Sequence, residues 1–134
     1  MKRRLELIGL ALPVMFVCGT PIFAHHSFAA FDMAKEITVS GVVKEFQWLN
    51  PHSWIQMNVK DASGNTVEWS IETGSPSSLS RQGWKPRILK PGDQITVITH
   101  PLRDGRNGGS LVSVTLADGT RIGGSPTNDP PPQN

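Results

Sequence analysis

Alternating apolar and polar residues on both sides of a short turn constrain the fold of this chain more than any other feature. After the turn, Ile55, Met57 and Val59 alternate with their neighbours, which is the pattern of a half-buried β-strand. Strand-like sequence also enters the turn from Ile37. The turn, Trp-Leu-Asn-Pro-His-Ser-Trp over 48–54, contains an Asn-Pro pair, and proline fixes φ and cannot donate to a ladder. The pattern predicts a long β-hairpin with two indoles and one imidazole at its tip.

The apolar residues of the first strand change face part-way along it. Ile37, Val39 and Val43 are odd-numbered and alternate on one face, whereas Phe46 and Trp48 are even-numbered. Successive strand residues point to opposite faces, so this shift predicts a β-bulge at residues 44–45. Gly41 would let the same strand bend. A long, bent first strand can pair in two sheets, as a small barrel requires.

Further along the chain, the sequence predicts a third strand, a short helix and two more strands. Ser75 is suited to cap the helix and Pro76 to begin it, and the helix should run to about residue 81 and end at Gly83. Alternating residues place the strands at Val67–Ile71, Ile95–Thr99 and Val112–Leu116, with turns at 61–65 and 90–93 and a loop at 103–109.

This order of elements is that of an OB barrel, in which a helix joins the third and fourth strands. We therefore predict an all-β fold: a small five-stranded OB-like Greek-key barrel with one short helix between strands three and four. A small open sandwich or an SH3-like barrel is the alternative. The predicted core consists of Val39, Val43, Ile55, Met57, Val59, Val67, Ile71, Val97, Val112 and Val114.

Both ends of the chain differ in composition from its middle. Three basic residues precede a mostly apolar run to Val17, which is typical of a secretory signal peptide, with cleavage expected after Ala24. A membrane anchor is disfavoured because the apolar run is shorter than the about 20 residues that a span needs. The expected organisation is a signal peptide at 1–24, an N-terminal arm at 25–36, the barrel domain at 37–122 and a disordered Pro-rich tail at 123–134.

Cleavage at Ala24 would change what charge and cysteine content imply. The chain has 13 basic and 11 acidic residues, and the first 24 residues hold three of the basic and one of the acidic ones. The mature chain is then neutral apart from its histidines, so we expect no nucleic-acid partner. The single cysteine of the full chain, Cys18, would be removed with the signal peptide, which leaves the mature chain without cysteine. We expect a periplasmic or secreted protein without a stable membrane anchor after cleavage.

Signatures of catalysis are lacking in the sequence. The mature chain has no cysteine nucleophile, no Gly-rich phosphate loop before a helix and no nucleophile elbow. We therefore expect a binding protein with no catalytic residues.

The histidines carry the clearest chemical signal. Cleavage would make His25 the N-terminus, where its free amine and Nδ1 could chelate one metal ion, with His26 next to it. Nitrogen ligands in tetragonal geometry suit Cu(II), so copper is the expected metal. His52 and His100 fall in loops that lie at the same end of an OB barrel. The ten residues from Ser27 to Glu36 span at most about 33–36 Å, enough to bring the N-terminus to that end.

Each histidine also has a simpler explanation when it is considered alone. The His25-His26 pair can be polar sequence at a cleavage site, His52 can close a turn by hydrogen bonding, and His100 can be a solvated strand end. Met57 lies on the inward face, which indicates a core residue and not a metal ligand.

The hairpin tip supports a second hypothesis. Trp48, Asn50, Pro51, His52 and Trp54 together could bind a carbohydrate, a peptide or a protein partner without any metal. Trp69 shares its strand face with Ile71 and is expected in the core.

Several short motifs together resemble a known family. They are Ala24-His25-His26-Ser27-Phe28, Phe31-Asp32, Gly41-Val42-Val43 and the tip sequence from Trp48 to Trp54. As a set, over roughly His25 to Leu116, they resemble a family of small exported bacterial proteins classed as a domain of unknown function. The resemblance implies export and a compact β-domain, brings no established activity, and marks His25, His26, Asn50, Pro51 and His52.

Overall fold

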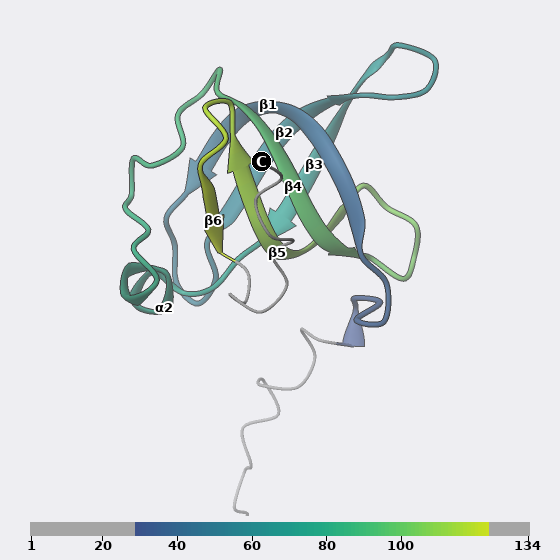
Figure 1. Cartoon of the computed structure of the whole chain (residues 1–134). Coiled ribbons are helices and arrows are strands. Elements are labelled where there is room, and N and C mark those ends of the chain that lie inside the picture. Colours follow the sequence, from purple (N-terminus) through teal and green to yellow (C-terminus); the bar gives the residue numbers. More distant parts are fainter. Residues whose placement is uncertain (1–28, 124–134) are drawn as a thin grey trace, which may run out of the picture.

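The computed structural model describes residues 29–123 (Figure 1). The predicted signal peptide at 1–24, the two histidines His25 and His26, and the tail after Gly123 lie outside the described residues. The elements are β1 (Ile37–Gln47), β2 (Trp54–Lys60), β3 (Thr66–Glu72), α2 (Pro76–Arg81), β4 (Gln94–Pro101), β5 (Gly108–Leu116) and β6 (Arg121–Gly123).

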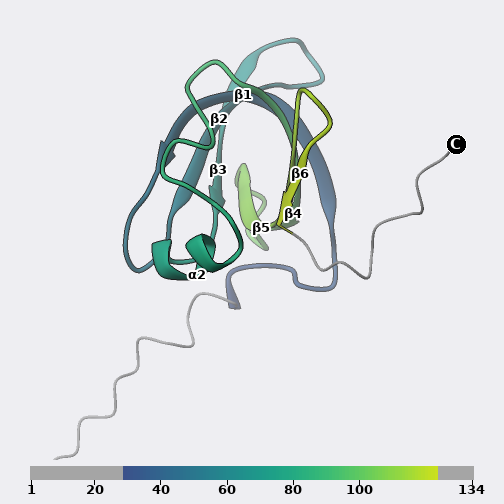
Figure 2. The same cartoon turned by 60° about the vertical axis from the view of Figure 1, so that its left-hand side comes forward.

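The first five strands form a closed barrel in the order β3-β2-β1-β4-β5. β1 pairs with β4 over 37–42 and with β2 over 42–47, so one strand serves both halves of the barrel, and Figure 2 shows it arching across the molecule. A parallel pairing between β3 and β5 closes the ring. With α2 between β3 and β4, this is the predicted five-stranded OB barrel, and the prediction is confirmed.

Two features of β1 allow it to curve. The pairing moves from Val43 opposite Met57 to Glu45 opposite Gln56, so Lys44 is the extra residue of a β-bulge, as the change of face predicted. At Gly41, a Cβ atom would lie 2.4 Å from the carbonyl oxygen of Asn58 on β2. Only glycine lets the two backbones approach this closely.

The core fills the barrel and is covered at one end by α2 and the segment after it. Ser75 caps α2 by accepting a hydrogen bond from the Ser78 amide, and Pro76 begins the helix, as predicted. The helix and the segment after it bury Leu79, Trp84 and Leu89. The remaining core residues are Val39, Val43, Ile55, Met57, Ile71, Ile95, Val97 and Val114.

Three predicted core valines are only partly buried. Val59 and Val67 face each other across β2 and β3 near a recess of about 620 Å³, which Trp69 also lines. Val112 is the residue that the pairing of β4 with β5 skips, between Ile98 and Thr99, and it is not among the residues of the core cluster. Alternation along a strand identifies its inward face, but it does not identify where the barrel is open or where a bulge reverses the faces.

The second half of the chain contains two further differences. Residues 108 and 109, expected in a loop, begin β5, because three strands meet there and leave no room for side chains. A Cβ at Gly109 would lie 2.2 Å from Thr99 Oγ1. The chain also continues past Gly119 into β6, a short strand that pairs with β5 outside the five-stranded ring.

The N-terminal arm is attached along the end of β4. Phe31 is buried and forms a bridge with Leu102. The amide of Asp32 donates to the Pro101 carbonyl over 2.8 Å. Within residues 29–123, no helix has the length and apolar character needed to cross a membrane.

Candidate functional site

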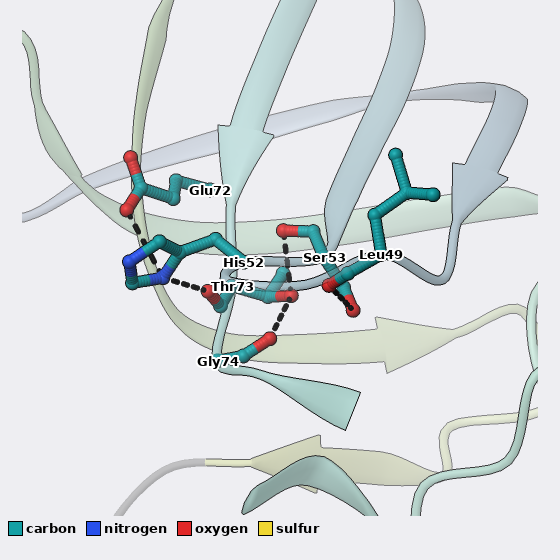
Figure 3. Close-up of polar contacts among 6 residues, drawn as sticks. All are labelled: Leu49, His52, Ser53, Glu72, Thr73 and Gly74. Atoms are coloured by element: carbon teal, nitrogen blue, oxygen red, sulfur yellow. Dashed lines mark hydrogen bonds and ion pairs between the residues drawn. The ribbon is translucent and has the colours of Figure 1, made fainter. Parts of the chain in front are cut away.

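The hairpin tip between β1 and β2 is fastened to the end of β3. Ser53 is fully buried; its amide donates to the Gly74 carbonyl over 3.0 Å, and its own carbonyl accepts from the amide and the hydroxyl of Thr73. The Ser53 hydroxyl donates back to the Leu49 carbonyl (Figure 3). The peptide bond between Asn50 and Pro51 is cis. The hydrogen bonds of Ser53 hold the loop against the end of β3, so His52 is presented by a fixed backbone.

His52 sits between two acceptors. Its Nδ1 lies 3.2 Å from the Thr73 carbonyl and 3.3 Å from a carboxylate oxygen of Glu72, as Figure 3 shows. Because both neighbours accept, Nδ1 carries the hydrogen, which leaves the Nε2 lone pair of the neutral ring as the acceptor or metal ligand. A carboxylate that fixes the far nitrogen of an imidazole is the usual support for a metal-binding histidine. The imidazole is 42% exposed and the Glu72 side chain only 13%.

His100 has the same tautomer, fixed by a different segment. Its Nδ1 lies 2.8 Å from the Lys35 carbonyl, so it donates to the arm and leaves Nε2 as the acceptor. Next to it, the amide of Arg103 donates to the Ala30 carbonyl over 2.9 Å. The end of β4 and the arm therefore form one connected unit that includes His100.

A row of outward-facing residues connects the two histidines. Glu72 on β3 pairs with Ser110 on β5, which pairs in turn with His100 on β4. Paired residues share a face, and strands lie about 4.8 Å apart, so the backbones of Glu72 and His100 are about 10 Å apart. Within residues 29–123, no three His, Cys, Asp or Glu side chains form a group that could hold a metal ion. The described part of the chain thus supplies two separate imidazoles, one at each end of this row.

The aromatic residues of the tip are used partly for packing. Trp48 contacts Phe46 edge-to-face, with ring centroids 5.7 Å apart. The ring centroid of Phe46 also lies 5.8 Å from that of Trp84. Trp48 is therefore a half-buried extension of the core. Trp54, at the start of β2, is also half-buried. The exposed residues of the tip are Leu49, Asn50 and Pro51.

His52 and Glu72 lie on the wall of a recess of about 230 Å³. The recess lies between the end of β3, the α2 region, β5 and the end of β6. Sequence reasoning identified His52 but missed Glu72, Gln82 and Ser110, which also line it. Glu72 follows the buried Ile71 on β3 and so faces outward, but only the parallel pairing of β3 with β5 brings it next to Ser110.

The resolved pKa changes lie in turns outside this site. The amide and hydroxyl of Thr120 donate to Asp118 and lower the pKa of that carboxyl. The backbone and side chain of Arg106 likewise lower the pKa of Asp104. Both carboxylates are exposed, and these bonds organise loops at the surface.

Comparisons with known proteins identify a family and leave the activity open. A crystal structure of a mitochondrial single-stranded DNA binding protein from S. cerevisiae matches with a TM-score of 0.45 and 12% identity, covering 62% of this chain and 94% of that chain. Curated proteins gave no significant match. A model of a family of unknown function (DUF6152) matches residues 14–112, most of the chain, and the protein belongs to that family.

Proposed function

We propose that this protein is an exported, periplasmic or secreted, binding protein that holds a metal ion such as Cu(II) through a mature N-terminal His25. The amine and imidazole of His25 would form the primary chelate, with His26 beside it and His100 as the nearest described imidazole. The observation that carries this proposal is the contact between His100 Nδ1 and the Lys35 carbonyl, at 2.8 Å. It links the histidine of β4 to the same segment that leads back to His25.

Chain length allows the two ends of the proposed site to meet. Ala30 is held by the Arg103 amide next to the end of β4. Ala30 is five positions after His25, so the backbone between them spans at most about 18 Å. His52 lies on the far side of the Glu72–Ser110–His100 row, so we assign it a lesser part in metal binding than His100. The proposed function is binding, with no catalytic step.

The primary chelate can be tested without removing any histidine. We expect the mature protein to bind Cu(II) with a nitrogen-rich tetragonal spectrum. One glycine inserted before His25 moves the free amine away from that imidazole and should weaken binding at least tenfold. Glycine inserted after Asn134 is the matched control and should change nothing. Equal copper affinity with and without the N-terminal glycine, measured by calorimetry, would refute the chelate.

The part of His100 needs a substitution that keeps its structural bond. Asparagine can place its amide N–H near the position of Nδ1, and so can still donate to Lys35, but it lacks a group at the position of Nε2. His100→Asn should therefore keep the melting temperature and lose copper affinity. His52→Asn is the parallel variant, and we expect a smaller loss. Unchanged copper affinity in His100→Asn would restrict the metal site to the N-terminus.

The second candidate function is a non-metal binding module for a carbohydrate, a peptide or a protein partner. Leu49, Asn50 and Pro51 favour it, because these three neighbouring tip residues are exposed while the loop behind them is held in place. Leu49 is 52% exposed and gives a partner an apolar side chain to cover. A neutral mature chain gives no support to a nucleic-acid partner.

A further inference from the structure

We propose that the edge of β1 that faces away from β4, over residues 37–41, is a docking site for an extended peptide segment of another protein. The peptide adds to the barrel as one more strand, and it carries a branched aliphatic side chain between two small polar residues. This open edge is separate from the metal chelate proposed above. It is also separate from the hairpin tip, which follows the other end of β1.

The open edge exists because β1 and β2 separate part-way along β1. Asn58 is the last residue of β2 that pairs with β1, and its partner is Val42. The preceding part of β1 pairs with β4. Figure 1 shows β1 turning away here, while β2 and β3 continue together into their turn. Within residues 29–123, no strand is therefore paired with the second edge of β1 at 37–41.

The hydrogen bonds of Val43 show which main-chain groups face the open edge. Its amide donates to the Asp93 carbonyl and its carbonyl accepts from the Gly92 amide, both over 2.8 Å, so both groups point to the β4 side. In an antiparallel strand, successive residues direct their N–H and C=O groups to opposite edges. Thr38 and Ser40 therefore direct these groups away from β4, to the open edge. Both residues are exposed, so a partner can reach them.

A peptide strand matches the chemistry of this edge. The donors and acceptors of Thr38 and Ser40 repeat at every second residue, and an added strand presents its own donors and acceptors at the same interval. An unpaired strand edge is a ready template for pairing with another chain. In complexes of this type the main-chain bonds supply affinity, and a pocket for alternate side chains supplies the preference for a sequence.

A recess of about 620 Å³ beside the open edge provides such a pocket. Its apolar lining consists of Val39, Val59, Val67 and Trp69. The last three are only partly buried, so the barrel leaves apolar surface uncovered here. Residues directly opposite each other in an antiparallel pair share a face. The peptide residue opposite Val39 would thus direct its side chain into the recess, where an aliphatic group covers that surface.

Two other occupants fit the open edge less well. Four of residues 124–134, the tail of this chain, are prolines, and proline cannot donate to a ladder. A second copy of the barrel would bring its own β2–β3 hairpin beside its own open edge, and the two hairpins would meet before the edges could pair. A short, flexible segment has no such obstacle, so we assign the edge to a peptide of a partner protein.

The experiment follows main-chain amides by NMR, with the pentapeptide acetyl-Thr-Ser-Val-Ser-Thr-amide as the probe. In the free protein, the amides of Thr38 and Ser40 should exchange with solvent at least tenfold faster than those of Val39 and Gly41, which face β4. Probe at millimolar concentration should slow the exchange of Thr38 and Ser40 at least tenfold. N-methylation of both serines of the probe removes the donors opposite these residues and should weaken binding at least tenfold. Replacing the valine of the probe by alanine should weaken it severalfold.

Two substitutions at Ser40 form a matched pair. Ser40→Pro removes the N–H that faces the open edge and leaves the ladder to β4 intact, so it should stay folded and lose at least tenfold in probe affinity. Ser40→Ala keeps that N–H and removes only the hydroxyl, which shares a 2.8 Å hydrogen bond with Thr96, so it should bind the probe like the wild type. Melting temperatures show whether both variants are folded. The N-methylated probe tests the same bonds without any change to the protein.

The outcomes separate this site from the other proposals. The glycine insertion before His25 should leave probe binding intact, because the metal chelate is not involved. Slow exchange of Thr38 and Ser40 in the free protein, no protection by millimolar probe, or equal affinity for the plain and N-methylated probes would overturn the proposal. Protection that appears without probe as the protein concentration rises, together with a dimer in sedimentation, would assign the open edge to a second copy instead.

Discussion

Val97→Asp is the sharpest test of the barrel and of the register of β4. Val97 is fully buried and lies between Val39 on β1 and Val114 on β5. The substitution loses the burial of a valine side chain, about 1.5–3 kcal/mol. It also leaves a carboxylate without a partner in the core, which costs about 3–5 kcal/mol more. The sum of about 5 kcal/mol or more equals or exceeds the stability of many small domains, so we expect the variant to be largely unfolded.

Two companion variants make this test quantitative. Val97→Ala removes the same side chain without adding charge and should cost about 2 kcal/mol, which lowers the melting temperature by about 8–16 °C. Val42→Asp introduces the same carboxylate on the outer face of β1, at a side chain that is 37% exposed, and should cost less than about 0.5 kcal/mol. Urea unfolding followed by tryptophan fluorescence measures all three. A Val97→Asp protein within 1 kcal/mol of the wild type, by the linear extrapolation, would refute the assigned register.

Two other predictions concern the end of β5 and the turn after it. Gly109→Ala should destabilise the protein by about 1–3 kcal/mol in urea unfolding, because its Cβ would lie 2.4 Å from the His100 carbonyl oxygen in a packed core. A variant that unfolds at the same urea concentration as the wild type would contradict the close approach of β4 and β5. The bonds from Thr120 lower the folded pKa of Asp118, so their contribution to stability is present above the unfolded pKa and is lost as the pH falls through the folded pKa. NMR titration should therefore find the pKa of Asp118 below its ordinary value, and Asp118→Asn should destabilise the protein at neutral pH and have no effect in strong acid.

Local patterns in the sequence were sufficient to predict most of the barrel. The change of face before Phe46 predicted the bulge at Lys44, and the Ser75-Pro76 pair predicted the start of α2. Each of these signals depends on a few neighbouring residues, because bulges and helix caps are made by short-range hydrogen bonds. The hairpin between β1 and β2 is local in the same sense.

The features that the sequence did not reveal depend on contacts between distant segments. Gly108 and Gly109 resemble loop residues until β3 and β4 approach them from both sides. Glu72 and Ser110 are unremarkable strand residues until a parallel pairing, across more than thirty residues of chain, places them on one face. The recess beside His52 is made entirely of such contacts, so composition and alternation along single strands cannot indicate it.

Both described histidines hold the fold together as well as presenting a free ring nitrogen, and this affects how any mutation at them is interpreted. His52 joins the hairpin tip to the Thr73 carbonyl at the end of β3, and His100 joins β4 to the Lys35 carbonyl in the arm. Alanine would remove the Nδ1 hydrogen bond and the Nε2 lone pair together, so a loss of binding could come from a displaced loop. Asparagine retains a donor near Nδ1 and glutamine places its amide nearer to Nε2, so the two substitutions at one position separate the structural bond from the ligand. If the asparagine variant loses binding at an unchanged melting temperature, the histidine Nε2 contacts the ligand. If binding and melting temperature fall together, the histidine supports binding through the fold.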